Sequence, residues 1–324
     1  MIKAILKRRY SMTDENKIKD LKEVKKPKLS MGMPIYNAAD VIKNRLDSLL
    51  NQSFSDFELI ISDNASTDMT SKICMDYARR DKRIRYIRQN ENMGLSWNFN
   101  FVLKESHGKY FVWVASDDIM LQGFIEKNIE ALEKNENLVC SMSRVKFVGE
   151  IIDNLNINLN DNFLKRIEKN FKKRLSASEV YSVSEKYEDK IRYYLKRRGF
   201  SLALYGIYRA EDLKKCIVEK GFHGEEWAII FNALRYGDFH VVDQILMYKY
   251  VGGTVSSNGM IKLIMQFKPG FMGKIIPYYD ITMWCAKNLG VKIFFRNLDC
   301  FVKLNFEGYV YLFYDIGRKF HLIT

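Results

Sequence analysis

The stretch Tyr110-Phe111-Val112-Trp113-Val114-Ala115-Ser116-Asp117-Asp118 decides the expected fold. Its uninterrupted apolar run is typical of a strand buried on both faces, and this run stops at two adjacent carboxylates. Such a pair at the end of a buried strand is costly unless a cation lies nearby, and Mg²⁺ or Mn²⁺ suits carboxylate oxygens. We therefore expect Asp117 and Asp118 to serve a divalent cation, with a plain helix-capping turn as the alternative.

Apolar runs and helical patterns alternate on both sides of this stretch. We expect strands at 28–35, 57–62, 84–87, 110–115, 138–147, 202–208 and 239–250. We expect helices at 39–50, 96–106, 123–134, 210–220 and 228–236. A further helix should follow Thr67, which would cap it. Alternation at this spacing predicts an α/β fold with right-handed βαβ units and a mostly parallel, Rossmann-like central sheet flanked by helices.

Composition narrows the class of protein further. The 324 residues are 47% hydrophobic and carry a formal net charge of +13. This composition allows a sizeable core and excludes wholesale disorder, while the charge favours polyanionic partners. Five scattered cysteines without a CxxC pair argue against a disulfide framework or zinc ribbon and favour a reducing compartment.

Three polar positions follow different expected strands, namely Asp63, Asn92 and Asp117. Ligands of parallel sheets bind beyond the carboxyl ends of the strands, so we expect these side chains to converge on one cleft. The first expected strand is followed by neither GxGxxG nor GxxxxGK[ST], which disfavours NAD enzymes and P-loop NTPases.

Ordered motifs over residues 28–250 carry a family resemblance. They are Pro34-Ile35-Tyr36-Asn37-Ala38, Asp63-Asn64-Ala65-Ser66-Thr67-Asp68, Asn92-Met93-Gly94, Ser116-Asp117-Asp118, Gly206-Ile207-Tyr208-Arg209 and Gly224-Glu225-Glu226-Trp227. In order and spacing the chain resembles family 2 of the inverting glycosyltransferases, which has the GT-A fold, and in particular the type that builds bacterial cell-surface glycans.

The resemblance implies a nucleotide-sugar donor, most often a UDP-sugar, and a role for each matching position. Pro34, Tyr36 and Asn37 would line the nucleotide pocket, and Asp63 would contact the base. Asn92 and Gly94 would shape the edge between nucleotide and donor sugar. Asp117 would meet the ribose or the sugar, and Asp118 would ligate Mn²⁺ or Mg²⁺.

The resemblance also implies a catalytic carboxylate near the acceptor. Glu226 occupies the position of the family's usual aspartate, and Glu225 stays a candidate because glutamate is longer by one methylene. His223 could bind an acceptor phosphate or assist this base, although a lone histidine in a loop flanked by glycines is more often a surface residue or a residue that lies behind the site. Trp227 either stacks on an acceptor sugar or belongs to the core.

An inverting transfer fits these parts. A carboxylate accepts the proton of the acceptor hydroxyl, and a cation neutralises charge on the leaving diphosphate. A glycoside hydrolase also uses two carboxylates, but it needs no nucleotide pocket. A nucleotidyltransferase of similar fold would have a Gly-rich, basic loop after the first strand, and 34–38 has neither. A basic nucleic-acid-binding protein is the alternative from another class, but no nucleic-acid motif accompanies the lysines, so we expect no nucleic-acid partner.

The pattern divides the chain into three parts. Residues 1–27 form a flexible basic lead-in. Residues 28–260 form the catalytic domain, with a nucleotide-binding half at 28–150 and an acceptor-binding half at 151–260 that contains a polar insertion, 151–198. Residues 261–324 form a helical extension rich in aromatic and basic residues.

The composition of the C-terminal extension bears on location. Aromatic residues beside lysines are typical of helices that lie on an anionic membrane surface, and packing on the protein or on a second subunit is the alternative. We find neither a signal peptide nor the run of about 20 apolar residues that a spanning helix needs. We expect a cytoplasmic protein that is peripheral on the inner face of the membrane and acts on a glycan or a lipid-linked saccharide.

Overall fold

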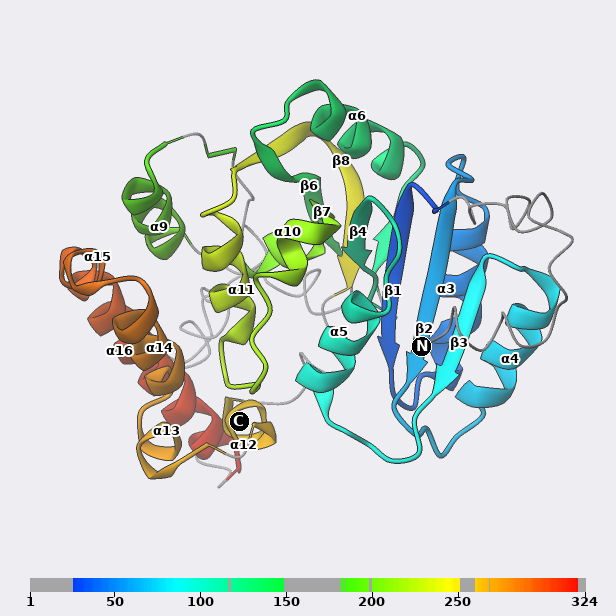
Figure 1. Cartoon of the computed structure of the whole chain (residues 1–324). Helices are drawn as coiled ribbons and strands as arrows, with labels where there is room; N and C mark the ends of the chain where they lie inside the picture. The colour runs from blue at the N-terminus through cyan, green and yellow to red at the C-terminus, as the bar shows by residue number, and fades with distance from the viewer. Residues whose placement is uncertain are drawn as a thin grey trace, which may run out of the picture.

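The computed structural model describes residues 26–115, 118–148, 182–183, 185–197, 200–250, 260–267 and 269–319 (Figure 1). The described strands form one sheet in the order β3-β2-β1-β4-β7-β6-β8-β5. Their bounds are β1 Leu29–Ile35, β2 Phe57–Asp63, β3 Ile84–Arg88, β4 Tyr110–Trp113, β5 Ile119–Met120, β6 Leu138–Val148, β7 Ile207–Arg209 and β8 Asp238–Tyr250. Strands β3, β2, β1 and β4 are parallel, as are β6 and β8, which confirms the mostly parallel sheet.

Helices cover both faces of the sheet because successive side chains of a buried strand point to opposite sides. On one face Met31 and Met33 pack with α3 (Ala39–Leu50) and α6 (Phe124–Lys134). On the other face Phe111 and Trp113 pack with α5 (Leu95–Lys104) and α11 (Glu225–Ala233). The sheet thus supplies a core on each side and leaves the ends of its strands for loops.

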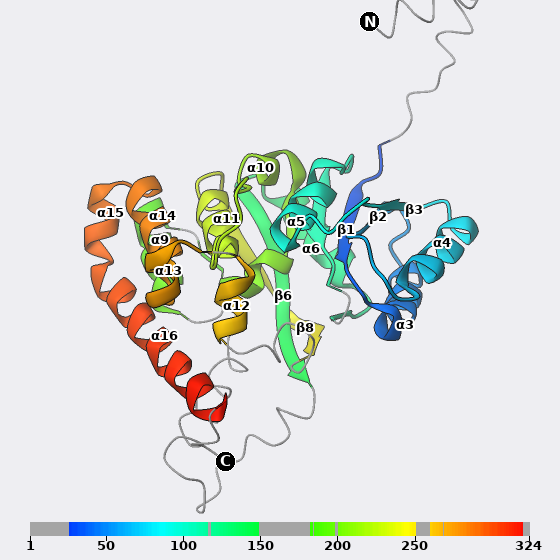
Figure 2. The same cartoon turned by 90° about the horizontal axis from the view of Figure 1, so that it is seen from below.

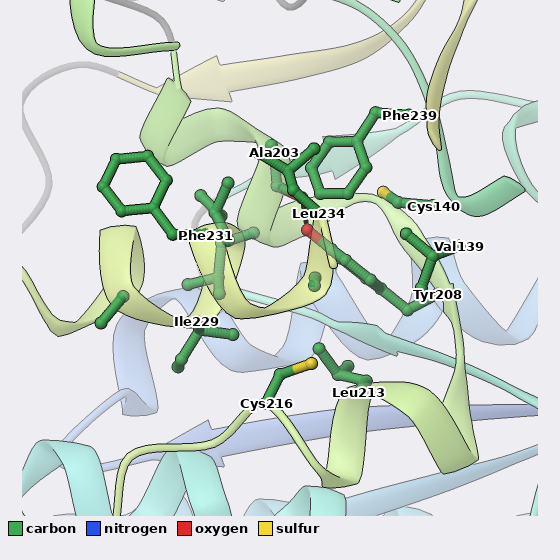
Figure 3. Close-up of a cluster of buried hydrophobic side chains, with 14 of the residues drawn as sticks. Val139, Cys140, Ala203, Tyr208, Leu213, Cys216, Ile229, Phe231, Leu234 and Phe239 are labelled. Carbon is green, nitrogen blue, oxygen red and sulfur yellow. Dashed lines mark hydrogen bonds between the residues drawn. The ribbon is translucent and has the colours of Figure 1, made fainter. Parts of the chain in front are cut away.

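Two expectations about residues 202–220 were wrong. Residues 202–208, expected as a strand, form a 3₁₀ helix over Phe200–Tyr205, and β7 is only three residues long. Tyr208 donates from its hydroxyl to the Ala203 carbonyl at 2.6 Å and packs on Phe239 (Figure 3). The run is therefore buried in a compact turn, and an apolar run alone does not distinguish these conformations. The helix expected at 210–220 ends at Lys214, as α10 (Ala210–Lys214).

The helix after β2 is α4 (Thr70–Arg80), and its cap is not Thr67 as expected. The Thr67 amide instead donates to Asn37 Oδ1 at 2.9 Å, across to the loop after β1. Asp68 accepts from the Thr70 amide in its place. Of the polar insertion, the described part contains α9 (Tyr187–Lys196), and residues 149–181 lie outside the described ranges, as do residues 1–25 of the lead-in.

The helical C-terminal extension is confirmed, and it packs beside α9 and α11 (Figures 1 and 2). Its helices are α12 Met260–Gln266, α13 Phe271–Ile275, α14 Tyr279–Asn288, α15 Val291–Arg296 and α16 Leu298–Lys319. Ile281 and Cys285 of α14 are fully buried, and Arg192 of α9 forms an ion pair with Asp299 at 3.0 Å. Among the described helices, none has the length and apolarity needed to cross a membrane.

Candidate functional site

The loops after β1 and β2 are tied together by their own polar groups. The Asn37 amide donates to Ser66 Oγ at 2.9 Å, and the Ala38 amide donates to Thr70 Oγ1 at 2.8 Å. Asn37 and Ala65 both have positive φ, 48° and 62°, a conformation that side chains with a Cβ rarely adopt. Such backbone persists only where its surroundings enforce it, which is common at ligand sites.

Asp63, expected to contact the base, is fully buried at the end of β2. Its Oδ1 accepts from the Ser66 amide at 2.8 Å, and its Oδ2 accepts from the Tyr86 hydroxyl at 2.7 Å and from Arg88 Nη1 at 3.1 Å. Protein donors thus contact both oxygens, and because the side chain is fully buried, a base contact would require a neighbouring group to move. Arg88 is exposed above this carboxylate and also donates to the Ser66 carbonyl.

Asn64 joins the end of β2 to the loop after β3. Its Nδ2 donates to Asn92 Oδ1 at 2.9 Å, and its Oδ1 accepts from the Met93 amide at 2.9 Å. Gly94 follows with φ of 90° and begins α5, a conformation that favours glycine. Asn92 and Gly94 are exposed, as is Tyr36 at 48%, so this edge is open to a ligand. Pro34 is half-buried at the end of β1.

Of the acidic pair, Asp117 lies outside the described residues, and Asp118 is buried directly before β5, with only 2% of its surface exposed. Strand β5 pairs antiparallel with β8 through Ile119↔Tyr248, which places Lys249 beside Asp118. The Lys249 Nζ donates to Asp118 Oδ2 at 2.7 Å. Within the described ranges, His, Cys, Asp and Glu do not gather in groups of three or more that could hold a metal.

Glu225 and Glu226 begin α11 after Gly224, whose φ is 91°. Ser96 Oγ, in the first turn of α5, donates to Glu225 Oε1 at 2.5 Å. Burial raises the pKa of Glu225 to about 7, although the bond from Ser96 opposes this shift. Burial also raises the pKa of Glu226. A carboxylate with a raised pKa is a better general base near neutral pH.

Aromatic side chains surround the start of α11. The Trp227 ring stacks on Tyr278 with centroids 5.6 Å apart, and the His223 ring meets Tyr278 edge-on at 4.9 Å. His223 is buried, which excludes a surface position, and burial lowers its pKa to about 4. The imidazole is therefore neutral at pH 7. Burial raises the pKa of Tyr278, and the charges of Glu226 and Glu307 raise it further.

The structure joins part of the expected site and adds residues that sequence reasoning missed. The loops bearing Asn37, Asp63 and Asn92 are bonded into one surface, and Ser96 links it to Glu225. Ser96, Arg88, Lys249 and Tyr278 were not expected. Of these four, only Arg88 could have been expected from the sequence, because it ends strand β3, which pairs with β2 beside Asp63.

Residues 30–204, more than half of the chain, match the family model described as Glycosyl transferase family 2. An uncharacterized glycosyltransferase of Haemophilus influenzae is 32% identical over 124 residues, covering 38% of either protein. The putative teichuronic acid biosynthesis glycosyltransferase TuaG of Bacillus subtilis is 37% identical over 105 residues, covering 32% of this chain and 42% of TuaG. The matched part of the chain spans less than half of each relative.

Solved structures share the fold. S. aureus TarS 1-349 in complex with UDP-GlcNAc aligns over 82% of this chain and 77% of that one, with a TM-score of 0.53 and 17% identity. The mannosyltransferase PcManGT from Pyrobaculum calidifontis, in complex with GDP-Man and Mn²⁺, aligns over 91% and 87%, with a TM-score of 0.51 and 12% identity. At these identities the likeness concerns the fold, and it confirms the expected GT-A architecture.

Proposed function

We propose, because the chain belongs to glycosyl transferase family 2, that it transfers a sugar from a nucleotide donor to a glycan or a lipid-linked saccharide. One contact in this structure supports the proposal independently of the family match. Ser96 follows the exposed Asn92–Gly94 loop, and its hydroxyl donates to Glu225 at the start of α11. A donor lying on the loops after β1–β3 would therefore face two carboxylates of raised pKa.

The donor is a UDP-sugar in this proposal. The exposed Tyr36, Asn92 and Gly94 and the half-buried Pro34 offer a surface for the nucleotide, with Asn37 holding the loop beneath it. TarS was solved with UDP-GlcNAc and PcManGT with GDP-Man, so nucleotide sugars bind proteins of this fold. Asp117 would face the ribose or the sugar.

The carboxylate of Asp118 suits a divalent cation as a ligand. Mg²⁺ and Mn²⁺ commonly take one or two carboxylates and complete their shell with substrate phosphates and water, so one buried carboxylate is a sufficient protein ligand. Because Lys249 Nζ donates to Asp118 Oδ2, the lysine would either share this carboxylate with the cation or give up its hydrogen bond. When bound, the cation would neutralise charge on the diphosphate.

The chain's own groups would perform the transfer with inversion. The acceptor hydroxyl attacks the anomeric carbon from the face opposite the diphosphate, a carbon–oxygen bond forms to the acceptor, and the bond to the diphosphate breaks. The hydroxyl proton passes to a carboxylate at the start of α11. Burial raises the pKa of both glutamates at this position, which makes either a better proton acceptor than an exposed carboxylate.

Thermal stability in the presence of UDP, GDP, dTDP or CMP, each with and without Mn²⁺, tests the function. We expect UDP with Mn²⁺ to raise the melting temperature, since a ligand at 100 times its Kd adds about 2.7 kcal/mol to the stability. Asp118→Ala should remove the dependence on Mn²⁺. Absence of a shift with all four nucleotides would overturn the proposal.

We further propose that the extension rests on an anionic bilayer and brings the enzyme to a lipid-linked acceptor. On α15 and α16 a row of apolar side chains, the apolar stripe, is between 43% and 69% exposed: Val291, Phe295, Leu298, Val302, Phe306 and Phe313. The four on α16 follow helical spacing and so share one face. The same helix contacts the surroundings of Glu226, because Asn305 Oδ1 accepts from the Tyr278 amide at 3.0 Å.

Charge favours lipid over a second copy of the chain as the partner of the apolar stripe. Among the described side chains of the extension six cations are exposed: Lys262, Lys274, Lys287, Lys292, Arg296 and Lys303. Two of them, Lys292 and Arg296, form ion pairs with Glu188 and Asp189 of α9. Among the described side chains of 260–319 one carboxylate is exposed, Asp299, and it pairs with Arg192. Two such surfaces would repel one another, whereas anionic lipid contributes about 1 kcal/mol per nearby cation.

Sedimentation with vesicles tests this docking. We expect binding to vesicles that contain phosphatidylglycerol, weaker binding at high salt, and loss of binding in Phe306→Ser. Ile245→Ser, which alters an exposed apolar residue on β8, should bind as the wild type does. Light scattering that finds a dimer broken by Phe306→Ser, without vesicle binding, would instead assign the apolar stripe to a second copy.

A further inference from the structure

The two adjacent glutamates of α11 face different parts of the molecule. Consecutive helical residues point about 100° apart. Glu225 accepts the hydrogen of Ser96, a residue 129 positions earlier in the nucleotide-binding half. Glu226 follows on the helix surface about 100° away, next to Trp227, whose ring stacks on Tyr278 of the C-terminal extension. Glu225 is therefore engaged with the donor side, and Glu226 begins at a different angle around the helix, beside the stacked aromatic rings.

The contact between Ser96 and Glu225 depends on close approach at Gly221. A Cβ at position 221 would lie 2.0 Å from Ser96 Oγ and 3.0 Å from Glu225 Oε2, distances at which a neighbour must move. Glycine at this position thus leaves room for the side chains of Ser96 and Glu225 to meet.

Ser96 is also close in sequence to the hydrogen-bonded loop after β3, where we expect the nucleotide sugar to bind. It stands two residues after Gly94, whose amide donates to Asn92 Oδ1 at 2.9 Å and whose carbonyl accepts from Asn64 Nδ2 at 3.2 Å. A shift of α5 against α11 would therefore move the loop after β3 relative to the carboxylates. Fixing such distances matters, because a misplacement of about 1 Å can cost about 100-fold in rate.

We propose that Glu225 is a positioning residue, which holds the donor loop against α11 through Ser96. Glu226, at the position of the family's usual aspartate, then keeps the role of base. This assignment rests on the proposed function. In it Glu225 keeps its hydrogen bond throughout the transfer, and Glu226 accepts the proton of the acceptor hydroxyl. Glu225 needs an acceptor oxygen but no negative charge for its role, whereas a base must be able to take up a proton.

Release of UDP from a UDP-sugar, measured with purified full-length protein, separates the two roles. Glu226→Gln should lower kcat by about 10²–10⁴-fold, the usual contribution of a general base. Glu225→Gln keeps an oxygen for Ser96 and should stay within about threefold of the wild type. Glu225→Ala and Ser96→Ala should each lower kcat/KM by about 10–100-fold, with the double variant no worse than either.

Two glycines supply a matched steric control. Gly221→Ala should reproduce Ser96→Ala, whereas Gly270→Ala, where a Cβ meets nothing within 4 Å, should leave turnover unchanged. If the wild type is active and Glu225→Gln is as inactive as Glu226→Gln, Glu225 needs its negative charge and the positioning assignment is wrong. If the wild type releases no UDP from any UDP-sugar, the proposed function itself fails, and the assignment fails with it.

Discussion

Lys249 Nζ lies 2.7 Å from Asp118 Oδ2, so an ammonium group already neutralises the carboxylate that we propose as the metal ligand. Both partners are largely buried, with side-chain exposures of 22% and 2%. Removing one partner of a buried pair leaves an uncompensated charge, which costs more than the pair itself contributes. The lysine and a divalent cation should therefore compete for one carboxylate.

We predict that Lys249→Met lowers the free energy of unfolding by about 2 kcal/mol, below the full cost of an unpaired buried charge because Lys249 is partly exposed. Mn²⁺ alone should raise the melting temperature of this variant more than that of the wild type, since the site then lacks its own cation. Lys146→Met, which alters an exposed lysine on the adjacent strand β6, serves as the control. Equal responses to Mn²⁺ would contradict the competition.

Asp63 should be as important to the fold as to the nucleotide. Replacing it with Asn keeps an acceptor for the Ser66 amide but turns a donor toward Tyr86 or Arg88. We predict a loss of about 2–4 kcal/mol in urea unfolding, with loss of the UDP-induced thermal shift. Asp76→Asn, which removes a surface pair with Arg79, should change stability by less than about 0.5 kcal/mol.

The strands and the loops that follow them could be predicted because local pattern determines them. Asp63 ends one apolar run and Asn92 comes shortly after the next. Because β2 and β3 are parallel, both following loops lie at the same end of the sheet. The contacts that organise the site could not be predicted in this way. Ser96 and Glu225 are 129 residues apart, and Asp118 and Lys249 are 131 apart, so their meeting depends on how whole elements pack.

Glu58 should stabilise the opposite end of the sheet. It accepts from Ser30 Oγ at 2.6 Å, from the His107 amide at 2.8 Å and from Arg85 Nη1 at 3.0 Å. Burial opposes ionisation, but these hydrogen bonds outweigh it, and the pKa of Glu58 lies below its usual value. Its contribution to stability is therefore present above the unfolded pKa near 4.5 and is lost as the pH falls through the lower folded value.

We predict that Glu58→Gln lowers the unfolding free energy by about 1–3 kcal/mol at pH 7, and that this difference shrinks toward pH 3. The UDP-induced shift in melting temperature should persist, because the network lies at the amino ends of the strands. A loss of UDP binding in a folded variant would show that the two ends of the sheet are coupled.

The contribution of Glu225 to stability should depend on pH in the opposite direction from that of Glu58. The folded pKa of Glu225, about 7, exceeds the usual 4.5, mainly through burial, so the folded state binds a proton more tightly than the unfolded state does. The stability linked to this proton is fully present below about pH 4.5 and is lost as the pH rises through about 7. Above pH 7 the folded protein must hold a half-buried charge beside Glu226.

Glu225→Gln should therefore be more stable than the wild type at pH 8, by about 1–3 kcal/mol, and nearly equal to it at pH 4.5. The amide keeps an oxygen for the hydroxyl of Ser96, so the comparison isolates the charge. Urea unfolding at the two pH values measures both differences. Glu219→Gln, at an exposed carboxylate paired with Lys104, should show no such divergence. Equal stabilities of Glu225→Gln and the wild type at pH 8 would mean that Glu225 ionises in the folded protein as readily as in the unfolded chain.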